Sequence, residues 1–191
     1  MEAQRMRRSS DLINCWLPVA GIIAAGTVVS APALGAQYFT VGAVQKALFA
    51  DAAEFVHRPL TLNPDQRRLL ASGFPVNSPL PGQGVWEARS GGKLIGFVVI
   101  DRVIGKHDLI TYATALNPDG TVMQVEIMEY REAYGYEVSN ARWLRQFAGK
   151  GRGSPLQVDQ DIQNISGATI SCEHVTAGVK RVLVLFDLFL K

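Results

Sequence analysis

Four strand-like segments and the turns between them constrain the fold of this chain more than any other feature. The segments are residues 85–88, 93–103, 109–116 and 121–130. Gly91-Gly92 separates the first pair and suits a tight hairpin turn. Asn117-Pro118-Asp119-Gly120 separates the second pair, and its proline and glycine positions suit a type I turn. The pattern predicts an antiparallel sheet of about four or five strands, a common sheet size.

Helical patterns precede the strands. Apolar residues at helical spacing over residues 41–57, followed by Pro59, predict a first helix. A second, short helix is expected over residues 64–71, with Asn63 as N-cap and Gly73 at its end. The fold class predicted from strands and helices together is therefore α+β.

Two further helices are expected after the strands. Ser139 or Asn140 caps the first of them, which carries Trp143, Leu144 and Phe147 on one side. The final helix is expected from about Cys172 to Leu190, with Ser171 as its N-cap. Its apolar face consists of Val175, Val179, Val182, Leu183, Phe186 and Leu190. Residues 182–190 are apolar nearly all round, so this end lies in the core or contacts a partner.

The N-terminus has the pattern of a targeting segment. A basic start is followed by an uncharged apolar run from about Leu12 to Ala36, which small residues close. Residues 1–36 are therefore interpreted as a signal peptide or a membrane anchor, either of which places the rest of the chain outside the cytoplasm. The remainder divides into a helical extension, residues 37–84, and a domain, residues 85–191.

Composition excludes several classes of function. The net charge of +2 over 191 residues argues against nucleic acid as the main partner. The three histidines, at positions 57, 107 and 174, have no metal-ligand spacing. Lys106-His107-Asp108 is interpreted as a polar turn, not as an acid–base set. We find no nucleophilic triad, dinucleotide fingerprint or P-loop, so no catalytic residue is assigned.

The chemistry is expected at Ser166-Gly167-Ala168-Thr169, which Ile170 and Ser171 follow. Small residues flank the Thr169 hydroxyl, so a bulky group can approach it. A helix N-terminus favours a phosphate through its free backbone N–H groups and its dipole. Thr169 could therefore carry a phosphate ester, and the neighbouring backbone could solvate the remaining phosphate oxygens.

This string resembles the flavinylation motif of the FMN-binding domain family, which includes the FMN-carrying subunits of the Rnf and sodium-pumping NADH:quinone reductase complexes. Residues 112–120 and 126–135 resemble the paired strands and following loop of that family. Glu132 and Gly135 match the first and last residues of its Glu-Thr-Pro-Gly loop, and the middle pair differs. The family commonly has an acid at the position of Gln163, and Asp161 lies two residues earlier. The resemblance covers roughly residues 85–190.

The resemblance implies covalent FMN, joined through its phosphate to Thr169 by a separate flavin transferase. Ser166, Gly167, Ala168, Ile170 and Ser171 are expected around the phosphate, and Glu132 and Gly135 near the flavin. Tyr134 and Tyr136 are either ring-stacking residues or ordinary surface and packed residues.

The function implied is an extracytoplasmic electron carrier between a membrane donor and an acceptor, rather than a turnover enzyme. Three alternatives remain open at this point. The first is a reductase acting directly on a small molecule or metal ion. The second is a sensory or binding module without flavin, and the third is an envelope interaction protein that uses the apolar C-terminal helix.

Overall fold

The computed structural model describes residues 36–72 and 84–191, which all belong to one compact unit. Residues 1–35, nearly all of the expected leader over residues 1–36, and the helix end expected at Gly73 lie outside the described residues. No helix in the described part of the chain is both long and apolar enough to cross a membrane.

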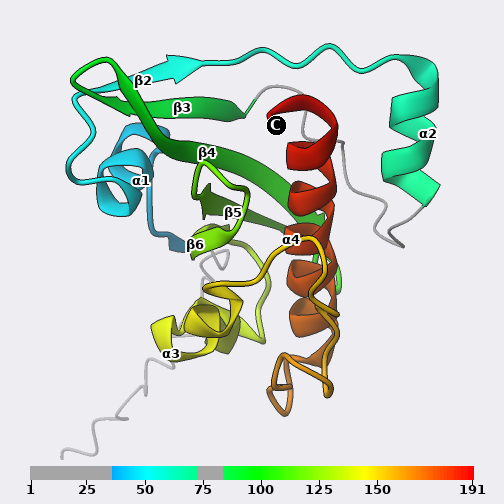
Figure 1. Cartoon of the computed structure of the whole chain (residues 1–191). Helices are drawn as coiled ribbons and strands as arrows, with labels where there is room; N and C mark the ends of the chain where they lie inside the picture. Colours follow the sequence, from blue (N-terminus) through cyan, green and yellow to red (C-terminus); the bar gives the residue numbers. More distant parts are fainter. Residues whose placement is uncertain (1–35, 73–83) are drawn as a thin grey trace, which may run out of the picture. The chain divides into compact units, whose positions relative to one another are not determined.

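Six antiparallel strands form one sheet in the order β1-β6-β5-β4-β3-β2 (Figure 1). The strands are β1 (Ala36–Gln37), β2 (Glu54–His57), β3 (Val85–Ser90), β4 (Lys93–Ile104), β5 (Leu109–Leu116) and β6 (Val122–Tyr130). Strands β3 to β6 are consecutive neighbours and form the meander that the turn signals predict. The α+β fold class is confirmed, and the sheet is slightly larger than the four or five strands expected.

The first expected helix is only half helical. Helix α1 covers Val41–Leu48, and the chain then turns through a hydrogen bond from the Ala52 amide to the Phe49 carbonyl, 3.2 Å long. The prediction of one helix over residues 41–57 is therefore wrong beyond Leu48, because Glu54–His57 forms β2. Strand β2 pairs with β3, whose edge supplies backbone partners that a local sequence pattern does not reveal.

Side-chain caps begin the three shorter helices. The Thr40 hydroxyl accepts a hydrogen bond from the Ala43 amide at the start of α1. Asn63 and Gln66 form a reciprocal capping box at the start of α2 (Pro64–Ser72), which begins where the sequence predicts. Asn140, one of two expected caps, accepts from the Arg142 amide at the start of α3 (Ala141–Leu144). The 3₁₀ segments η1 (Tyr136–Ser139) and η2 (Arg145–Phe147) flank α3.

Helix α4 (Thr169–Phe189) begins three residues earlier than expected. Its N-cap is Ala168, so the prediction of Ser171 as N-cap is wrong: Ser171 lies within the first turn. The expected apolar face is buried from Val175 to Phe186, whereas Leu190 follows the helix end and is half-buried. At the apolar C-terminal end of α4, Leu185 and Phe186 are therefore buried in the core, while Leu188 is 41% exposed.

The sheet is apolar on both faces. Alternate residues of β4 point to opposite sides, so Phe97 and Val99 join the core under α4 while Val98 joins a smaller cluster under α1. The ring of Phe186 on α4 meets that of Phe97 edge-to-face, with centroids 5.6 Å apart. Helix α4 thus lies along one face of the sheet (Figure 1).

A buried ion pair joins α4 to the centre of the sheet. Arg181 of α4 and Asp101 of β4 are each 1% exposed in their side chains, and Arg181 Nη2 lies 2.6 Å from Asp101 Oδ2. The Tyr112 hydroxyl of β5 donates to the same oxygen over 2.6 Å. Burial raises the pKa of Asp101, and the guanidinium of Arg181 lowers it in part. This cluster fixes the position of α4 along β4.

Candidate functional site

The start of α4 presents free polar backbone. Ala168 offers no capping side chain, and Gly167 before it has a φ of +86°, a conformation that glycine adopts at little cost. A β-carbon at Gly167 would meet nothing within 4 Å, so the backbone here borders open space. A helix N-terminus without a side-chain cap keeps unsatisfied N–H groups and the positive end of the helix dipole, which favours an anion.

Ser171 ties the helix start to the loop after β6. Its hydroxyl oxygen lies 3.1 Å from the Tyr130 hydroxyl oxygen, and Tyr130 in turn donates to the Tyr134 carbonyl over 2.5 Å. Because the single tyrosine proton is used on that carbonyl, Ser171 is the donor to Tyr130. Burial raises the pKa of Tyr130. These bonds hold the first turn of α4 against residues 131–135.

Gly135 fits closely behind this link. Its φ is +87°, and a β-carbon there would lie 2.7 Å from the Tyr130 hydroxyl oxygen and 3.4 Å from the Ala168 β-carbon. Only glycine therefore allows both the left-handed turn and the close approach of the loop to α4. Gly135 therefore supports the site by letting the loop after β6 pack closely against the start of α4.

Glu132 holds a second turn at the site. Its Oε1 accepts hydrogen bonds from the amides of His107 and Asp108, the latter over 2.8 Å. Gly105 begins the turn between β4 and β5, and a β-carbon there would lie 2.6 Å from Glu132 Oε1. The side chain of Glu132 is therefore engaged in fixing residues 105–108.

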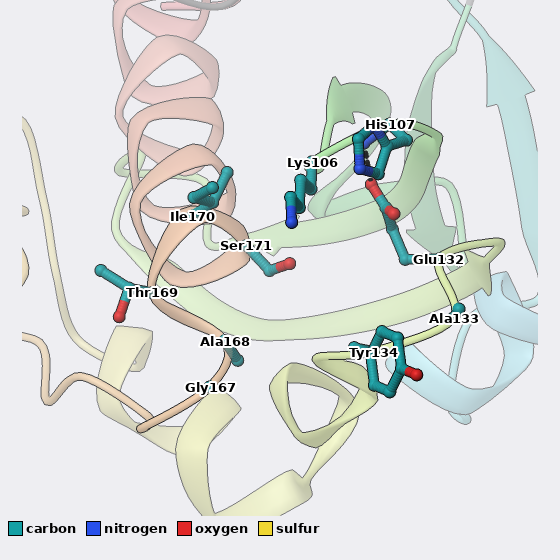
Figure 2. Close-up of a pocket in the computed structure, with 10 residues that line it drawn as sticks. All are labelled: Lys106, His107, Glu132, Ala133, Tyr134, Gly167, Ala168, Thr169, Ile170 and Ser171. Carbon is teal, nitrogen blue, oxygen red and sulfur yellow. Dashed lines mark hydrogen bonds between the residues drawn. The ribbon is translucent and has the colours of Figure 1, made fainter.

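These three segments enclose a cavity of about 510 Å³ (Figure 2). Its lining residues are Lys106, His107, Glu132, Ala133, Tyr134, Gly167, Ala168, Thr169, Ile170 and Ser171. They come from the β4–β5 turn, the loop after β6 and the start of α4. The volume lies within the range of small-molecule and cofactor sites.

The structure brings most of the sequence-predicted site residues together. Gly167, Ala168, Thr169, Ile170, Ser171 and Glu132 line the cavity. Ser166 and Gly135 are not among the lining residues. Ser166 is exposed just before α4, and Gly135 packs against Tyr130 and the start of α4. Thr169 is exposed, and its side chain points to the opposite side of the first turn from that of Ser171 (Figure 2). A group on Thr169 would thus start at the outer rim of the cavity.

Sequence reasoning missed the contribution of the β4–β5 turn. Lys106 and His107 line the cavity, although the sequence suggested only a polar turn. A signal was available, because alternate loops of an antiparallel meander lie at the same end of the sheet. Ile110 pairs with Tyr130, which places the β4–β5 turn beside the loop that leaves β6. Tyr134 also lines the cavity and is 84% exposed, whereas Tyr136 is 61% exposed and is not among its lining residues.

The two polar residues before the motif have structural contacts. The backbone of Gln163 accepts from Trp143 Nε1 and donates to Gln146 Oε1, while its side chain is exposed. The carboxylate of Asp161 binds Lys150 Nζ over 2.9 Å and two backbone amides. Burial opposes ionisation of Asp161, but these hydrogen bonds outweigh it and lower its pKa. Asp161 is thus engaged in holding its own loop.

The described residues contain no group of three or more His, Cys, Asp or Glu side chains placed to hold a metal ion. Cys172, in the first turns of α4, is buried, and burial raises the pKa of its thiol. The charged side chains that line the cavity are Lys106 and Glu132, and the uncapped helix start lines it as well.

Comparison with known proteins agrees with this site. The sequence profile of the FMN-binding domain matches residues 105–184, a range that includes all three segments of the cavity. One subunit of the proton-translocating ferredoxin:NAD(+) oxidoreductase complex of Clostridium ljungdahlii is 30% identical over 128 residues, which are 62% of this chain and 69% of the relative. The corresponding protein of the Na(+)-translocating complex of Acetobacterium woodii is 24% identical over 188 residues, 93% of this chain and 86% of the relative.

The crystal structure of Shewanella oneidensis NqrC superposes with a TM-score of 0.49 at 17% identity, covering 71% of this chain and 80% of that chain. The identity and coverage of the Clostridium ljungdahlii relative, with the profile match across the cavity, decide the family. This chain belongs to the FMN-binding domain family.

Proposed function

We propose that this protein is an extracytoplasmic electron carrier that holds FMN through a phosphoester to Thr169. The observation that carries the proposal is the placement of Thr169, an exposed hydroxyl at the uncapped start of α4 and on the rim of the cavity. FMN bound there would supply reversible electron transfer, and the protein would supply its position and its electrostatic environment.

The residues at the site fit the group. Open space beside Gly167 leaves room for a phosphate at the helix start, and the N–H groups of the first turn suit its negative charge. The apolar side of Ile170, which is 41% exposed, and the ring of Tyr134 offer surface for a flat aromatic group. Thr169 lies at the rim of the cavity of about 510 Å³, so a group attached to it can enter that space.

A separate flavin transferase is part of the proposal. A threonine hydroxyl is a weak nucleophile unless a base activates it. The Thr169 side chain points away from the side chains across the cavity, so none of those residues is placed to activate it (Figure 2). Its exposure instead suits attack catalysed by a second protein that docks on the start of α4.

Electron relay is favoured over turnover of a substrate. The relatives in Clostridium ljungdahlii and Acetobacterium woodii are named as subunits of ferredoxin:NAD(+) oxidoreductase complexes. We infer that this chain likewise exchanges electrons with a membrane electron-transport partner. Tyr134 lines the cavity and is 84% exposed, so a ring bound beside it would lie close to the surface, where a partner protein could reach it.

The extracytoplasmic location rests on the leader pattern of residues 1–36. A covalent tether suits that location, because FMN lost outside the cytoplasm is not readily replaced. Protease added to cells stripped of their outer layers, with the cell membrane still sealed, should digest the protein but not a cytoplasmic marker, which tests the location separately from the cofactor.

Intact mass is the decisive test of the site. The full chain is expressed with a flavin transferase and measured as wild type, Thr169→Ala, Thr169→Ser and Ser166→Ala. We expect wild type, Thr169→Ser and Ser166→Ala to gain the mass of FMN less one water, and Thr169→Ala to gain none. Ser166 is the matched control, since it is an exposed hydroxyl in the same motif.

An unmodified wild type beside a modified known substrate of the transferase would refute the covalent link. A modified Thr169→Ala variant would move the link to another residue. If the purified, reduced wild type turned over a small molecule without any partner, the carrier assignment would give way to a reductase.

A further inference from the structure

The β4–β5 turn is held at the cavity by hydrogen bonds from two neighbouring segments and by one bond within the turn itself. Glu132 accepts the amides of His107 and Asp108, and the Gly105 amide donates to the Asp108 carbonyl over 2.7 Å. On the other side, a ring nitrogen of His174 on α4 bonds to the carbonyl of Ile104. A turn fixed in this way presents the residue at its centre, Lys106, in a defined place.

Lys106 brings a positive charge to the cavity. Its side chain lines the space and reaches from the turn toward the first turn of α4, on the side of Ser171 (Figure 2). Among the described residues, its ammonium has no hydrogen bond or ion pair. Glu132, the acid on the lining, forms no ion pair with Lys106 and uses its Oε1 to accept two backbone amides. The Lys106 charge is therefore available to a bound group.

The placement of Lys106 suits the flavin ring better than the phosphate. The Thr169 side chain points to the outer side of the helix start, whereas Lys106 reaches in from the turn across the cavity (Figure 2). The ribityl chain of FMN separates its phosphate from its ring. With the phosphate at the rim, a ring held in the cavity would have Lys106 and His107 of the β4–β5 turn among its neighbours, because these residues line the same space.

We propose that Lys106 tunes the redox potential of the bound flavin by stabilising the negative charge that the ring gains on reduction. The inference rests on the proposed function above. Uptake of two electrons from the electron donor and one proton from solvent leaves one negative charge on the ring. The ammonium of Lys106 attracts that charge and has no equal interaction with the neutral oxidised ring, so it favours reduction.

The expected size of the effect follows from the exposure of the lysine. Lys106 is exposed, so its field is screened by water and salt. We expect its removal to lower the equilibrium constant for two-electron reduction about twofold to fivefold, which is a fall of about 10–20 mV in midpoint potential. Raising the ionic strength reduces the difference, because salt screens exposed charges.

The experiment is spectroelectrochemical titration of the flavin-loaded full chain as wild type, Lys106→Gln, Lys106→Arg and Lys93→Gln. Lys93 is the matched control, an exposed lysine at the opposite end of β4. We expect Lys106→Gln to lower the midpoint potential, and Lys106→Arg and Lys93→Gln to leave it near that of wild type. Because the Lys106 side chain has no described partner, Lys106→Gln is expected to keep the wild-type unfolding midpoint.

The outcomes separate this inference from the proposed function. A wild type without flavin refutes the function. A loaded Lys106→Gln variant with the wild-type potential, or a Lys93→Gln shift of equal size, refutes the role of Lys106 and leaves the function intact. Equal potentials with a lower yield of attached FMN in Lys106→Gln would instead assign Lys106 to phosphate attachment, which also overturns the inference.

Discussion

Breaking the buried ion pair under α4 offers the sharpest test of how this fold holds its site. The perturbation is Arg181→Met, which removes the guanidinium and leaves an unbranched apolar side chain. The Asp101 carboxylate then stays 1% exposed. Of the two side chains that donated to it, Arg181 and Tyr112, only the Tyr112 hydroxyl remains. A buried charge without its partner is expensive, because burial removes its hydration.

The expected loss is about 3–5 kcal/mol in the free energy of unfolding, the range found when one partner of a buried ion pair is removed. For a domain of this size, that corresponds to a fall of roughly 6–20 °C in Tm. Arg68→Met is the matched control, because Arg68 pairs with Asp65 while their side chains are 77% and 88% exposed. We expect that change to stay within about 0.5 kcal/mol of wild type.

The loss depends on pH in a defined direction. Burial raises the pKa of Asp101 above its ordinary value of 3.8, and removal of Arg181 takes away a group that lowers it. An acid with a raised folded-state pKa weakens the fold as pH rises from the unfolded-state pKa to the folded-state pKa. The Arg181→Met variant should therefore lie closer to wild type at pH 5 than at pH 8.

Urea unfolding at the two pH values measures both effects. Replacing the whole cluster, as Asp101→Leu/Tyr112→Phe/Arg181→Met, should restore most of the stability, because apolar groups then replace all three polar partners. An Arg181→Met variant within about 1 kcal/mol of wild type at pH 8 would refute the reasoning. So would a triple variant as unstable as the single one.

Three further predictions concern the site itself. Gly135→Ala should lose about 1–3 kcal/mol of stability, because its φ is +87° and the new β-carbon would lie 2.7 Å from the Tyr130 hydroxyl oxygen. Urea unfolding checks this beside the control Gly42→Ala, whose new β-carbon would meet nothing within 4 Å. Glu132→Ala should speed hydrogen exchange of the His107 amide at least several-fold while the core amides keep their protection, and an unchanged His107 rate would contradict the bond. The Cys172 thiol should react with iodoacetamide at pH 8 far more slowly in the native protein than in urea, because burial raises its pKa and excludes the reagent; equal rates would contradict its burial.

The central meander could be predicted because its signals are local. Glycine and proline at turn positions act within a few residues, and the strand boundaries of β3 to β6 agree with those expected to within two residues. The long apolar run of β4 also agrees with its burial on both faces. The Asn63 cap of α2 and the Asn140 cap of α3 were predictable for the same reason, since a cap needs only its own helix.

The predictions fail where contacts with a segment distant in sequence determine the local structure. Residues 54–57 continue a helical pattern, yet they pair with β3 because that edge satisfies their backbone groups. Ser171 is a good N-cap by residue type, but its hydroxyl bonds to Tyr130, forty-one residues earlier in the chain, and the helix begins at Thr169 instead. No local pattern contains that information.

By itself the sequence determined the α+β class, the order of the central strands, and the motif at residues 166–169 on which the FMN proposal rests. Only the tertiary structure decided which groups face that motif. Sheet pairing places the β4–β5 turn beside the loop after β6, and the Asp101–Arg181 pair fixes α4 against them. The cavity with Lys106 on one wall and Thr169 on its rim arises from these long-range contacts, because a site built from three segments exists only after the backbone has brought them together.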